Sequence, residues 1–295
     1  MEDDQAIAGP KSESRLKSAL TLLRRNKELP VGATVVVILI GTAIAVEIAN
    51  LLGRQITPYN PLAQDVGPVL APPSWTHLFG TDLVGSDVFS RVVAATPNDM
   101  AVGLAVVGVA FLLGTIIGTA AAFKGGIFDE VLMRFTDVVF ALPIIIIAMV
   151  VAVTLGPGLI NMTVALMIIW WPPYARLARG QALTIKHQSY IEAARFSGMG
   201  TGRMIVKHVI PNVFTTMLVY ATLDLGIVIL TYAGLSYLGL SVRPPYPDWG
   251  EMVSSYQDYM IAAPWLPLVP GLIIVAGVVG FSLLGDGIRD ALESR

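Results

Sequence analysis

The chain has no cysteine and only three histidines among its 295 residues. Without cysteine it can form neither a disulfide framework nor a thiolate metal site. His77, His187 and His208 lie far apart and lack the spacing of metal ligands, so we expect no metal site. Charged residues make up 14% of the chain, whereas soluble domains carry roughly 25%. The net charge of −2 does not indicate a nucleic-acid partner, and the scarcity of charge indicates a membrane protein.

Two catalytic motifs are missing as well. The sequence has no Gly-x-x-x-x-Gly-Lys-Ser/Thr loop, so we expect no ATP hydrolysis by this chain alone. It has no His-Glu-x-x-His pair and no activated nucleophile, which argues against a membrane enzyme. A self-contained secondary transporter usually shows an internal repeat with broken helices at matching positions. The prolines that break the third and fourth predicted spans have no clear counterparts elsewhere in the sequence. The secondary transporter is kept as an alternative.

Long apolar runs dominate the sequence. A helix needs about 20 mostly apolar residues to cross a bilayer. Pro143 and Pro157 interrupt one of the runs, and Pro172 and Pro173 break another. The sequence predicts an all-α integral membrane protein with six transmembrane helices. Their expected ranges are about residues 31–52, 100–123, 138–159, 162–177, 213–240 and 264–284.

The distribution of Lys and Arg predicts the orientation, because cytoplasmic loops carry an excess of both. With the N-terminus inside, all but Arg54, Arg91 and Arg243 of the 19 Lys and Arg residues lie on the cytoplasmic side. Residues 1–30 then form a basic cytoplasmic tail of a multi-pass protein of the cell membrane, and the C-terminus is cytoplasmic too. The two extracytoplasmic segments, 53–98 and 241–263, are too long and proline-rich for simple turns, so we expect ordered caps in contact with lipid at their edges.

A polar segment of about residues 186–211 lies between the fourth and fifth predicted spans. Ser189 stands three residues before Glu192, which is the spacing of a capping box. Gly198 follows about two helical turns later, where a left-handed C-cap is needed. Thr201 is expected to cap a second helix. The pattern predicts a tight helical hairpin, and on local grounds alone this is only a capped surface loop whose basic residues bind lipid headgroups.

The same segment resembles the EAA loop of ABC-importer permeases. Residues 192–194 read Glu-Ala-Ala, Gly198 follows, and residues 208–211 close the motif as His-Val-Ile-Pro. The family usually closes with Ile-x-Leu-Pro, and a His at this point is typical of its peptide-transporter branch. A metal or acid-base role for His208 is a weaker second interpretation.

The resemblance extends over roughly residues 15–295. Residues 80–91 are similar to the Gly-Thr-Asp-x-Leu-Gly-Arg-Asp-x-x-Ser-Arg segment of oligopeptide and dipeptide permeases, with differences at Val84 and Ser86. Residues 235–250 and 284–290 are similar to later segments of the second permease of such systems. The resemblance therefore identifies the chain as a second-permease type of the peptide/nickel branch.

This resemblance implies a type I ABC-importer transmembrane domain over residues 31–295, forming half of a pore for di- or oligopeptides. It implies a homologous second permease, two ATPase domains that hold ATP and Mg, and an extracytoplasmic substrate-binding protein, with no cofactor on this chain. Oligosaccharides and nickel are the alternative substrates. No histidine lies inside a predicted span, which argues against a pore that handles nickel. The residues implied in coupling to the ATPases are Glu192, Ala193, Ala194, Gly198, Arg203 and Pro211.

Asp224 lies in the middle of a predicted span, where a charge is costly unless it faces a partner or water. It is expected either to line the pore or to make a helix-packing hydrogen bond to Thr or Tyr on another span. Gly114 and Gly118 have the small-xxx-small spacing that permits close helix approach. That approach is expected within the chain, with dimerisation as the alternative.

Several charged residues cluster in the first extracytoplasmic segment and at its end. Asp82, Asp87, Arg91 and Asp99 are expected either to cap the segment by salt bridges or to meet the binding protein. The sequence does not separate these two alternatives. Trp249, in the second extracytoplasmic segment, is a further candidate contact for the binding protein.

Overall fold

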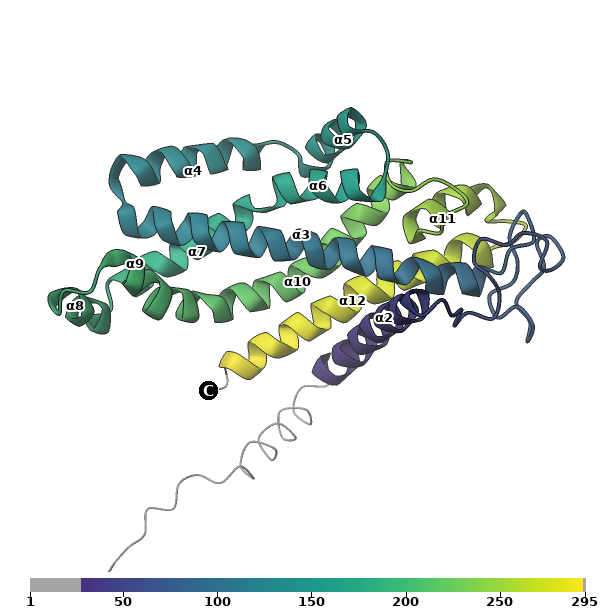
Figure 1. Cartoon of the computed structure of the whole chain (residues 1–295), viewed down its shortest axis with the longest axis horizontal. Helices are drawn as coiled ribbons and strands as arrows, with labels where there is room; N and C mark the ends of the chain where they lie inside the picture. Colours follow the sequence, from purple (N-terminus) through teal and green to yellow (C-terminus); the bar gives the residue numbers. More distant parts are fainter. Residues whose placement is uncertain (1–27, 294–295) are drawn as a thin grey trace, which may run out of the picture.

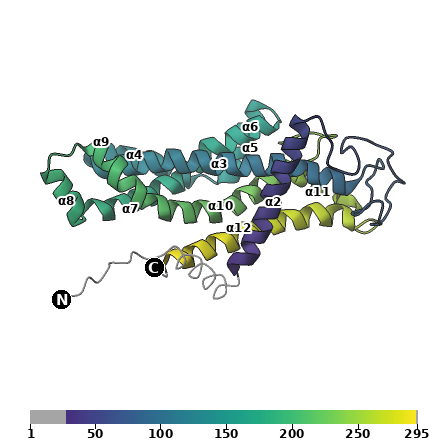
Figure 2. The same cartoon turned by 60° about the horizontal axis from the view of Figure 1, so that its bottom comes forward.

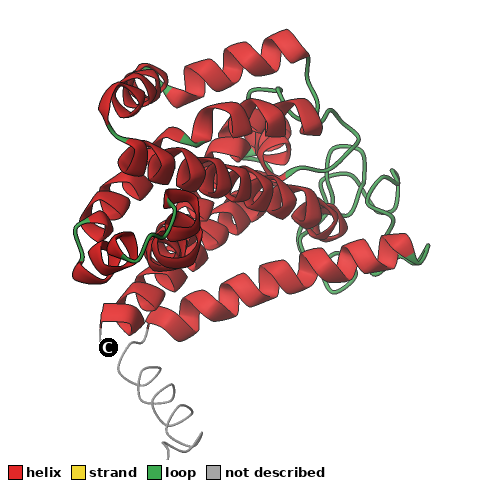
Figure 3. Ribbon diagram, turned by 60° about the vertical axis from the view of Figure 1, so that its left-hand side comes forward, coloured by secondary structure: helices red, strands yellow, loops and turns green. Residues whose placement is uncertain are grey.

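The computed structural model describes residues 28–293, so most of the predicted basic tail, residues 1–30, lies outside the described part. Within residues 28–293 the regular elements are helices, and Figure 3 shows the loops gathered mainly on one side. The elements are α2 (Glu28–Leu51), α3 (Val88–Lys124), α4 (Gly126–Ala141), α5 (Ile144–Leu155), α6 (Leu159–Trp170), α7 (Pro172–Lys186), α8 (Ser189–Phe196), α9 (Thr201–Met204), a π turn η1 (Ile205–Val209), α10 (Ile210–Tyr237), α11 (Trp249–Tyr256), a 3₁₀ turn η2 (Gln257–Tyr259) and α12 (Trp265–Glu293).

Four helices among the described residues are long and apolar enough to cross a membrane. They are α2, α3, the continuous run from Thr201 to Tyr237, and α12. Helix α3 has 37 residues, which at 1.5 Å per residue is about 55 Å, longer than the bilayer core. It begins at Val88, so the end of the first predicted extracytoplasmic segment, residues 88–98, is helical.

The predicted third span is bent rather than continuous. Helices α4 and α5 together pass as one apolar span, but they meet at an angle of 85°. Pro143 causes the break, because it lacks an amide hydrogen and forces the preceding Leu142 out of helical conformation, to φ −87° and ψ 140°.

The predicted fourth span is divided between α6 and α7, of 12 and 15 residues. Pro172 and Pro173 occupy the first positions of α7, where their missing amide hydrogens are tolerated. The structure thus offers four spans, or five if α4 and α5 count as one, and the count of six stays a prediction.

Helices α3 and α10 lie side by side along the long axis of the molecule (Figure 1). Figure 1 shows α8 and α9 at one end of this axis, and the loop between α2 and α3 at the other end with α11 near it. Helix α2 crosses against α12 (Figure 2). Their backbones approach closely because Gly32 has no side chain: a Cβ there would lie 2.5 Å from the Leu284 amide nitrogen.

Two glycines allow α3 to pack tightly against α7. A Cβ on Gly114 would lie 2.3 Å from the Tyr174 Cβ, and one on Gly118 would lie 2.2 Å from the Ala175 carbonyl oxygen. Real Cβ atoms do not approach this closely, so these positions require glycine. The expectation that this pair packs within the chain is confirmed.

We predict that Gly118→Leu lowers the yield and thermal stability of the purified protein, since overpacking a tight contact costs about 1–3 kcal/mol or more. The matched control is Gly108→Leu on the same helix, where an added Cβ meets nothing within 4 Å. Thermal unfolding in detergent measures both variants. Equal melting temperatures for the two would show that the α3–α7 contact is not close in the folded protein.

Candidate functional site

The polar segment of residues 186–211 folds as two helices joined by a tight turn, which we call the α8–α9 hairpin. Its first helix does not begin with a capping box. Gln188 occupies the N-cap position with φ −78° and ψ 142°, and no side chain caps the helix. The Glu192 amide donates to the Gln188 carbonyl at 3.2 Å, so Ser189 is already inside the helix. The predicted capping box is therefore wrong, because α8 begins at Ser189 and the N-cap is Gln188.

The end of α8 has the predicted left-handed cap. Gly198 has φ +80°, a conformation that other residues adopt only at a cost. The amide of Met199 donates to the Ala194 carbonyl at 3.1 Å, and the amide of Gly198 donates to the Arg195 carbonyl at 3.0 Å. These are the two hydrogen bonds of a Schellman motif. The turn direction of the hairpin is therefore set by Gly198.

The second helix of the hairpin continues without a gap into α10. Gly200, rather than Thr201, is its N-cap, so the predicted Thr201 cap is wrong because Thr201 is already helical. From Thr201 to Tyr237 the chain forms one run of 37 residues. The hairpin is therefore continuous with a helix that is long and apolar enough to span a membrane.

A π turn interrupts this run just before Pro211. The Ile210 amide donates to the Ile205 carbonyl, five residues earlier. Pro211 has no amide hydrogen, and its ring would crowd the carbonyl four residues before it in a regular α-helix. The wider π turn relieves this crowding, and the Asn212 side-chain amide donates to the His208 carbonyl at 2.6 Å. Single π turns occur often at functional positions.

The hairpin is anchored on one side and exposed on the other. Ile191 and Val209 are fully buried, and Met204 is 2% exposed. Glu192 is exposed, and Phe196 is 90% exposed. The exposed set also includes Ala193, Arg195 and Arg203, while Ala194 is half-buried. The hairpin thus presents an exposed face on which Phe196 is the most exposed aromatic side chain, while Tyr190 is 43% exposed.

Helix α7, which leads into the hairpin, is tied to its neighbours by charged groups. Arg179 binds Asp129 of α4 in a two-pronged contact, with Nε–Oδ1 at 2.6 Å and Nη2–Oδ2 at 2.7 Å. Arg176 donates to Asp137 of α4 at 2.5 Å. Lys186 Nζ donates to the Ala122 carbonyl at 2.7 Å, at the C-terminal end of α3, where free carbonyls favour a cation. These contacts were missed in the sequence, because the partners lie 39 to 64 residues apart.

We predict that Asp129→Asn weakens this tie and lowers the free energy of unfolding by about 1–3 kcal/mol, the usual range for a hydrogen bond to a charged group. The control is Glu130→Gln, the next residue. Its pair with Arg134 has both side chains more than half exposed, and such surface pairs contribute about 0–1 kcal/mol. Denaturant unfolding of the purified protein compares them, and equal losses would mean that the Asp129 contact is no stronger than a surface pair.

The charged cluster of the first predicted extracytoplasmic segment is buried. Asp87 caps the start of α3: it accepts from the Ser90 amide at 2.8 Å and contacts His77 Nδ1 at 2.9 Å. Asp82 accepts from the amides of Val84 and Ser86, at 3.0 and 2.8 Å. Its Oδ2 lies 3.7 Å from Arg91 Nε. These interactions cap the segment, which is the first of the two alternatives expected for these residues.

The other alternative, contact with a binding protein, receives no support from this geometry. Asp82, Asp87 and Arg91 are 3%, 2% and 6% exposed, and Asp99 is fully buried. Trp249 is also fully buried, and its indole donates to the Val92 carbonyl at 3.1 Å. In this conformation Asp82, Asp87, Arg91 and Trp249 make contacts inside the protein, and their meeting a binding protein stays a prediction.

Comparison with known proteins identifies the family. Residues 110–295, which include the whole α8–α9 hairpin, match the family described as the inner membrane component of binding-protein-dependent transport systems. The chain belongs to this family. With four or five apolar helices in the described part, it is a multi-pass membrane protein with the fold of a type I ABC-importer transmembrane domain.

Several curated relatives resemble the chain over most of its length. A probable D,D-dipeptide transport system permease of Escherichia coli is 33% identical over 296 residues, all of this chain and 97% of the relative. A di/tripeptide transport system permease of Pseudomonas aeruginosa is 37% identical over 251 residues, 83% of each chain. A glutathione transport system permease of Pectobacterium atrosepticum is 39% identical over 223 residues, 76% of this chain and 74% of the relative.

In this transport-system component, Asp224 joins three helices. Its carboxylate on α10 accepts from the Trp170 indole of α6 at 2.6 Å and from the Tyr174 hydroxyl of α7 at 2.8 Å. The side chain is buried, and Asp224 is 5% exposed. These contacts match the expected helix-packing alternative, with a Tyr as one partner, and the pore-lining role stays a prediction.

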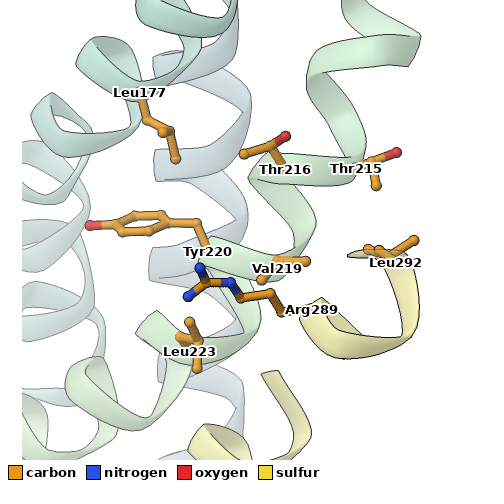
Figure 4. Close-up of a pocket in the computed structure, with 8 residues that line it drawn as sticks. All are labelled: Leu177, Thr215, Thr216, Val219, Tyr220, Leu223, Arg289 and Leu292. Carbon is orange, nitrogen blue, oxygen red and sulfur yellow. The ribbon is translucent and has the colours of Figure 1, made fainter. Parts of the chain in front are cut away.

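A cavity of about 370 Å³ lies beside this junction, between α7, α10 and α12 (Figure 4). Tyr220 lines it, and the Tyr220 ring packs edge-on against Tyr174, with centroids 4.9 Å apart. Arg289 of α12 reaches into the same space, next to Leu223. Tyr220, rather than Asp224, therefore forms the wall of the cavity, and Asp224 supports it through Tyr174.

Proposed function

We propose that the chain is a permease subunit of an ATP-driven importer and forms half of the pore for di- or oligopeptides. The observation that carries this proposal is the α8–α9 hairpin, an exposed face continuous with a 37-residue apolar helix. The names of the relatives, which refer to dipeptides, di/tripeptides and glutathione, support a short-peptide substrate. Oligosaccharide or nickel import by the same machinery is the alternative.

The proposed partners complete what this chain lacks. A homologous second permease supplies the other half of the pore, and an extracytoplasmic binding protein delivers the substrate. Two ATPase domains bind ATP and Mg, since this sequence has no phosphate-binding loop of its own. The hairpin meets these domains in the cytoplasm, so both termini are cytoplasmic. The transporting unit is the segment 31–295, and this chain acts without catalytic residues.

The hairpin connects to the rest of the protein through two helices, α7 before it and α10 after it. The run from Thr201 to Tyr237 carries a displacement of the hairpin into α10, while the Arg179–Asp129 contact holds α7 against α4. ATP can shift the pore between conformations only if the ATPases bind the hairpin differently in each. Glu192, Ala193, Ala194 and Arg203 form the contact face in this mechanism, Gly198 fixes its angle, and Pro211 sets the π turn at the membrane edge.

The decisive contact in this mechanism is expected at Phe196. Aromatic side chains that enter a partner's pocket commonly cost 2 kcal/mol or more when truncated. We therefore expect Phe196→Ala to weaken binding of the purified ATPase subunits by about 30-fold, which corresponds to about 2 kcal/mol. The measurement is a binding titration against the permease pair in nanodiscs.

The control for this titration is Ile160→Ala on α6, which removes another largely exposed apolar side chain (76%) from a different helix. Its affinity for the ATPase should equal that of the unmodified protein. Unchanged affinity in Phe196→Ala would show that the ATPases dock without Phe196. No binding of the ATPases to the unmodified protein would instead favour an ATP-independent transporter, the alternative from another class.

A further inference from the structure

Asp99 is a buried acidic residue of α3 that the proposed function does not use. Its exposed fraction is 0%, and neither of its carboxylate oxygens has a hydrogen-bond partner among the described residues. The backbone amides of Trp249 and of Asp99 itself lie nearby but outside hydrogen-bonding geometry. Seven buried side-chain atoms in the described part of the chain lack a partner, and two of them belong to Asp99. Buried polar groups are normally paired, so this acid needs an explanation.

Helix α3 presents Asp99 to the place where α10 and α11 meet. Helix positions four and seven residues apart lie on one face. Seven residues before Asp99, the Val92 carbonyl accepts from the Trp249 indole of α11 at 3.1 Å. Four residues after it, a Cβ on Gly103 would lie 3.1 Å from Ile229 of α10. Asp99 therefore lies between the contacts that bring α10 and α11 against α3, which we call the α3–α10–α11 junction.

A second buried carboxyl group at this junction, that of Asp248, takes the available donors. Asp248 is the N-cap of α11, is fully buried, and acts on Asp99 electrostatically. Five groups donate to it, namely the amides of Gly250 and Glu251 and the hydroxyls of Tyr232, Ser236 and Ser241. Tyr232 of α10 also lies within electrostatic reach of Asp99, and its hydroxyl adds no charge. Donors favour an ionised carboxylate, so the negative charge of the junction belongs to Asp248.

An ionised Asp99 would add a second negative charge to the same junction, with no donor to stabilise it. A buried charge without a partner costs so much free energy that the group takes up a proton instead. Two carboxyl groups that share one site lose their protons in separate steps for the same reason. We infer that Asp99 is a proton-binding site, whose carboxyl group holds a hydrogen ion at neutral pH while α11 is packed against α3. The inference requires neither an ATPase nor a substrate, so it stands apart from the proposed function.

Release of this proton is linked to opening of the α3–α10–α11 junction. The carboxylate form of Asp99 becomes stable only where water or donors reach it, so an open junction binds the proton less tightly than the packed one. Low pH therefore favours the packed junction and high pH the open one. In the unfolded chain an ordinary Asp releases its proton above about pH 4. At neutral pH the folded protein thus holds one proton more than the unfolded chain, and its stability falls as the pH rises.

The test is infrared difference spectroscopy of the purified full-length protein in nanodiscs at neutral pH, comparing the unmodified protein with Asp99→Asn. We expect the carbonyl stretching band of a protonated carboxyl group, which shifts in heavy water and disappears in Asp99→Asn. Asp258→Asn, an exposed residue of η2, is the control and should leave this band unchanged. Loss of a carboxylate band in Asp99→Asn, with the carboxyl region unchanged, would overturn the inference.

The stability of the same proteins as a function of pH is the second readout. Between about pH 5 and 8, the unfolding equilibrium constant of the unmodified protein should rise by up to about tenfold per pH unit relative to that of Asp99→Asn, because unfolding releases one proton. A ratio that does not change with pH would overturn the inference. Failure of Asp99→Asn to fold would overturn it too, since a neutral side chain of the same shape should be accepted where the acid is neutral.

Discussion

Gly198→Val is expected to abolish ATP-dependent uptake while the protein still folds and reaches the membrane. Gly198 has φ +80°, and a left-handed conformation costs an ordinary residue about 1–2 kcal/mol and a β-branched one more. An added Cβ meets no atom within 4 Å, so the substitution causes no clash. The substitution therefore strains only the turn. The turn changes direction and moves α8 away from the ATPase.

Two further substitutions separate backbone strain from the added side chain. Gly198→Asn should retain much of the uptake, because Asn tolerates the left-handed region better than other residues. Gly200→Val is the matched control: Gly200 has φ −63° and ψ 146°, which any residue adopts, and nothing lies within 4 Å of its Cβ position. Uptake and ATPase rates are measured on the reconstituted complex. Normal uptake by Gly198→Val would show that the angle of the hairpin does not matter.

Asp224→Leu is expected to have the largest effect on stability in the membrane-embedded part of the chain. It removes the acceptor of the Trp170 indole and of the Tyr174 hydroxyl, both at buried positions. Each orphaned donor costs about 1–3 kcal/mol, so the loss should reach about 2–6 kcal/mol. Denaturant unfolding and the yield of monodisperse protein measure it.

Asp224→Asn distinguishes this packing role from a role in the pore. The amide oxygen of Asn still accepts a hydrogen bond, so most of the stability should be retained. The double variant Asp224→Leu with Trp170→Phe should lose less than the sum of the single losses, because the indole donor is no longer left unpaired. If both Asp224 variants were as stable as the unmodified protein and altered only peptide uptake, Asp224 would act on the substrate instead.

The sequence predicted the helical class well and the breaks only in part. Apolar runs of about 20 residues are a strong signal for helices in a membrane, and four of the expected spans are long helices. Pro143 indicated an interruption, but the 85° bend depends on what α5 packs against. The caps expected at Ser189 and Thr201 were wrong because each helix begins one residue away, and helix ends are the least determined part of a local pattern.

The sequence predicted the candidate site best where the backbone adopts a conformation that one residue type favours. Gly198 is such a case, because few other residues adopt its conformation. The partners of Asp224 lie 50 and 54 residues away, so the sequence left its role open. Trp249 was expected at the surface, yet its indole bonds to Val92, 157 residues away, and no local pattern carries that information.

The most direct test of the importer account is a mild purification of the tagged protein from native membranes, with every co-purifying chain identified by mass. The account predicts a second, homologous permease and ATPase subunits, with the ATPase lost from the Gly198→Val preparation and retained in Gly200→Val. A protein that purifies alone or as a homodimer, with no ATPase, would contradict it. The α8–α9 hairpin would then be only a surface turn, and an ATP-independent transporter would become the leading interpretation.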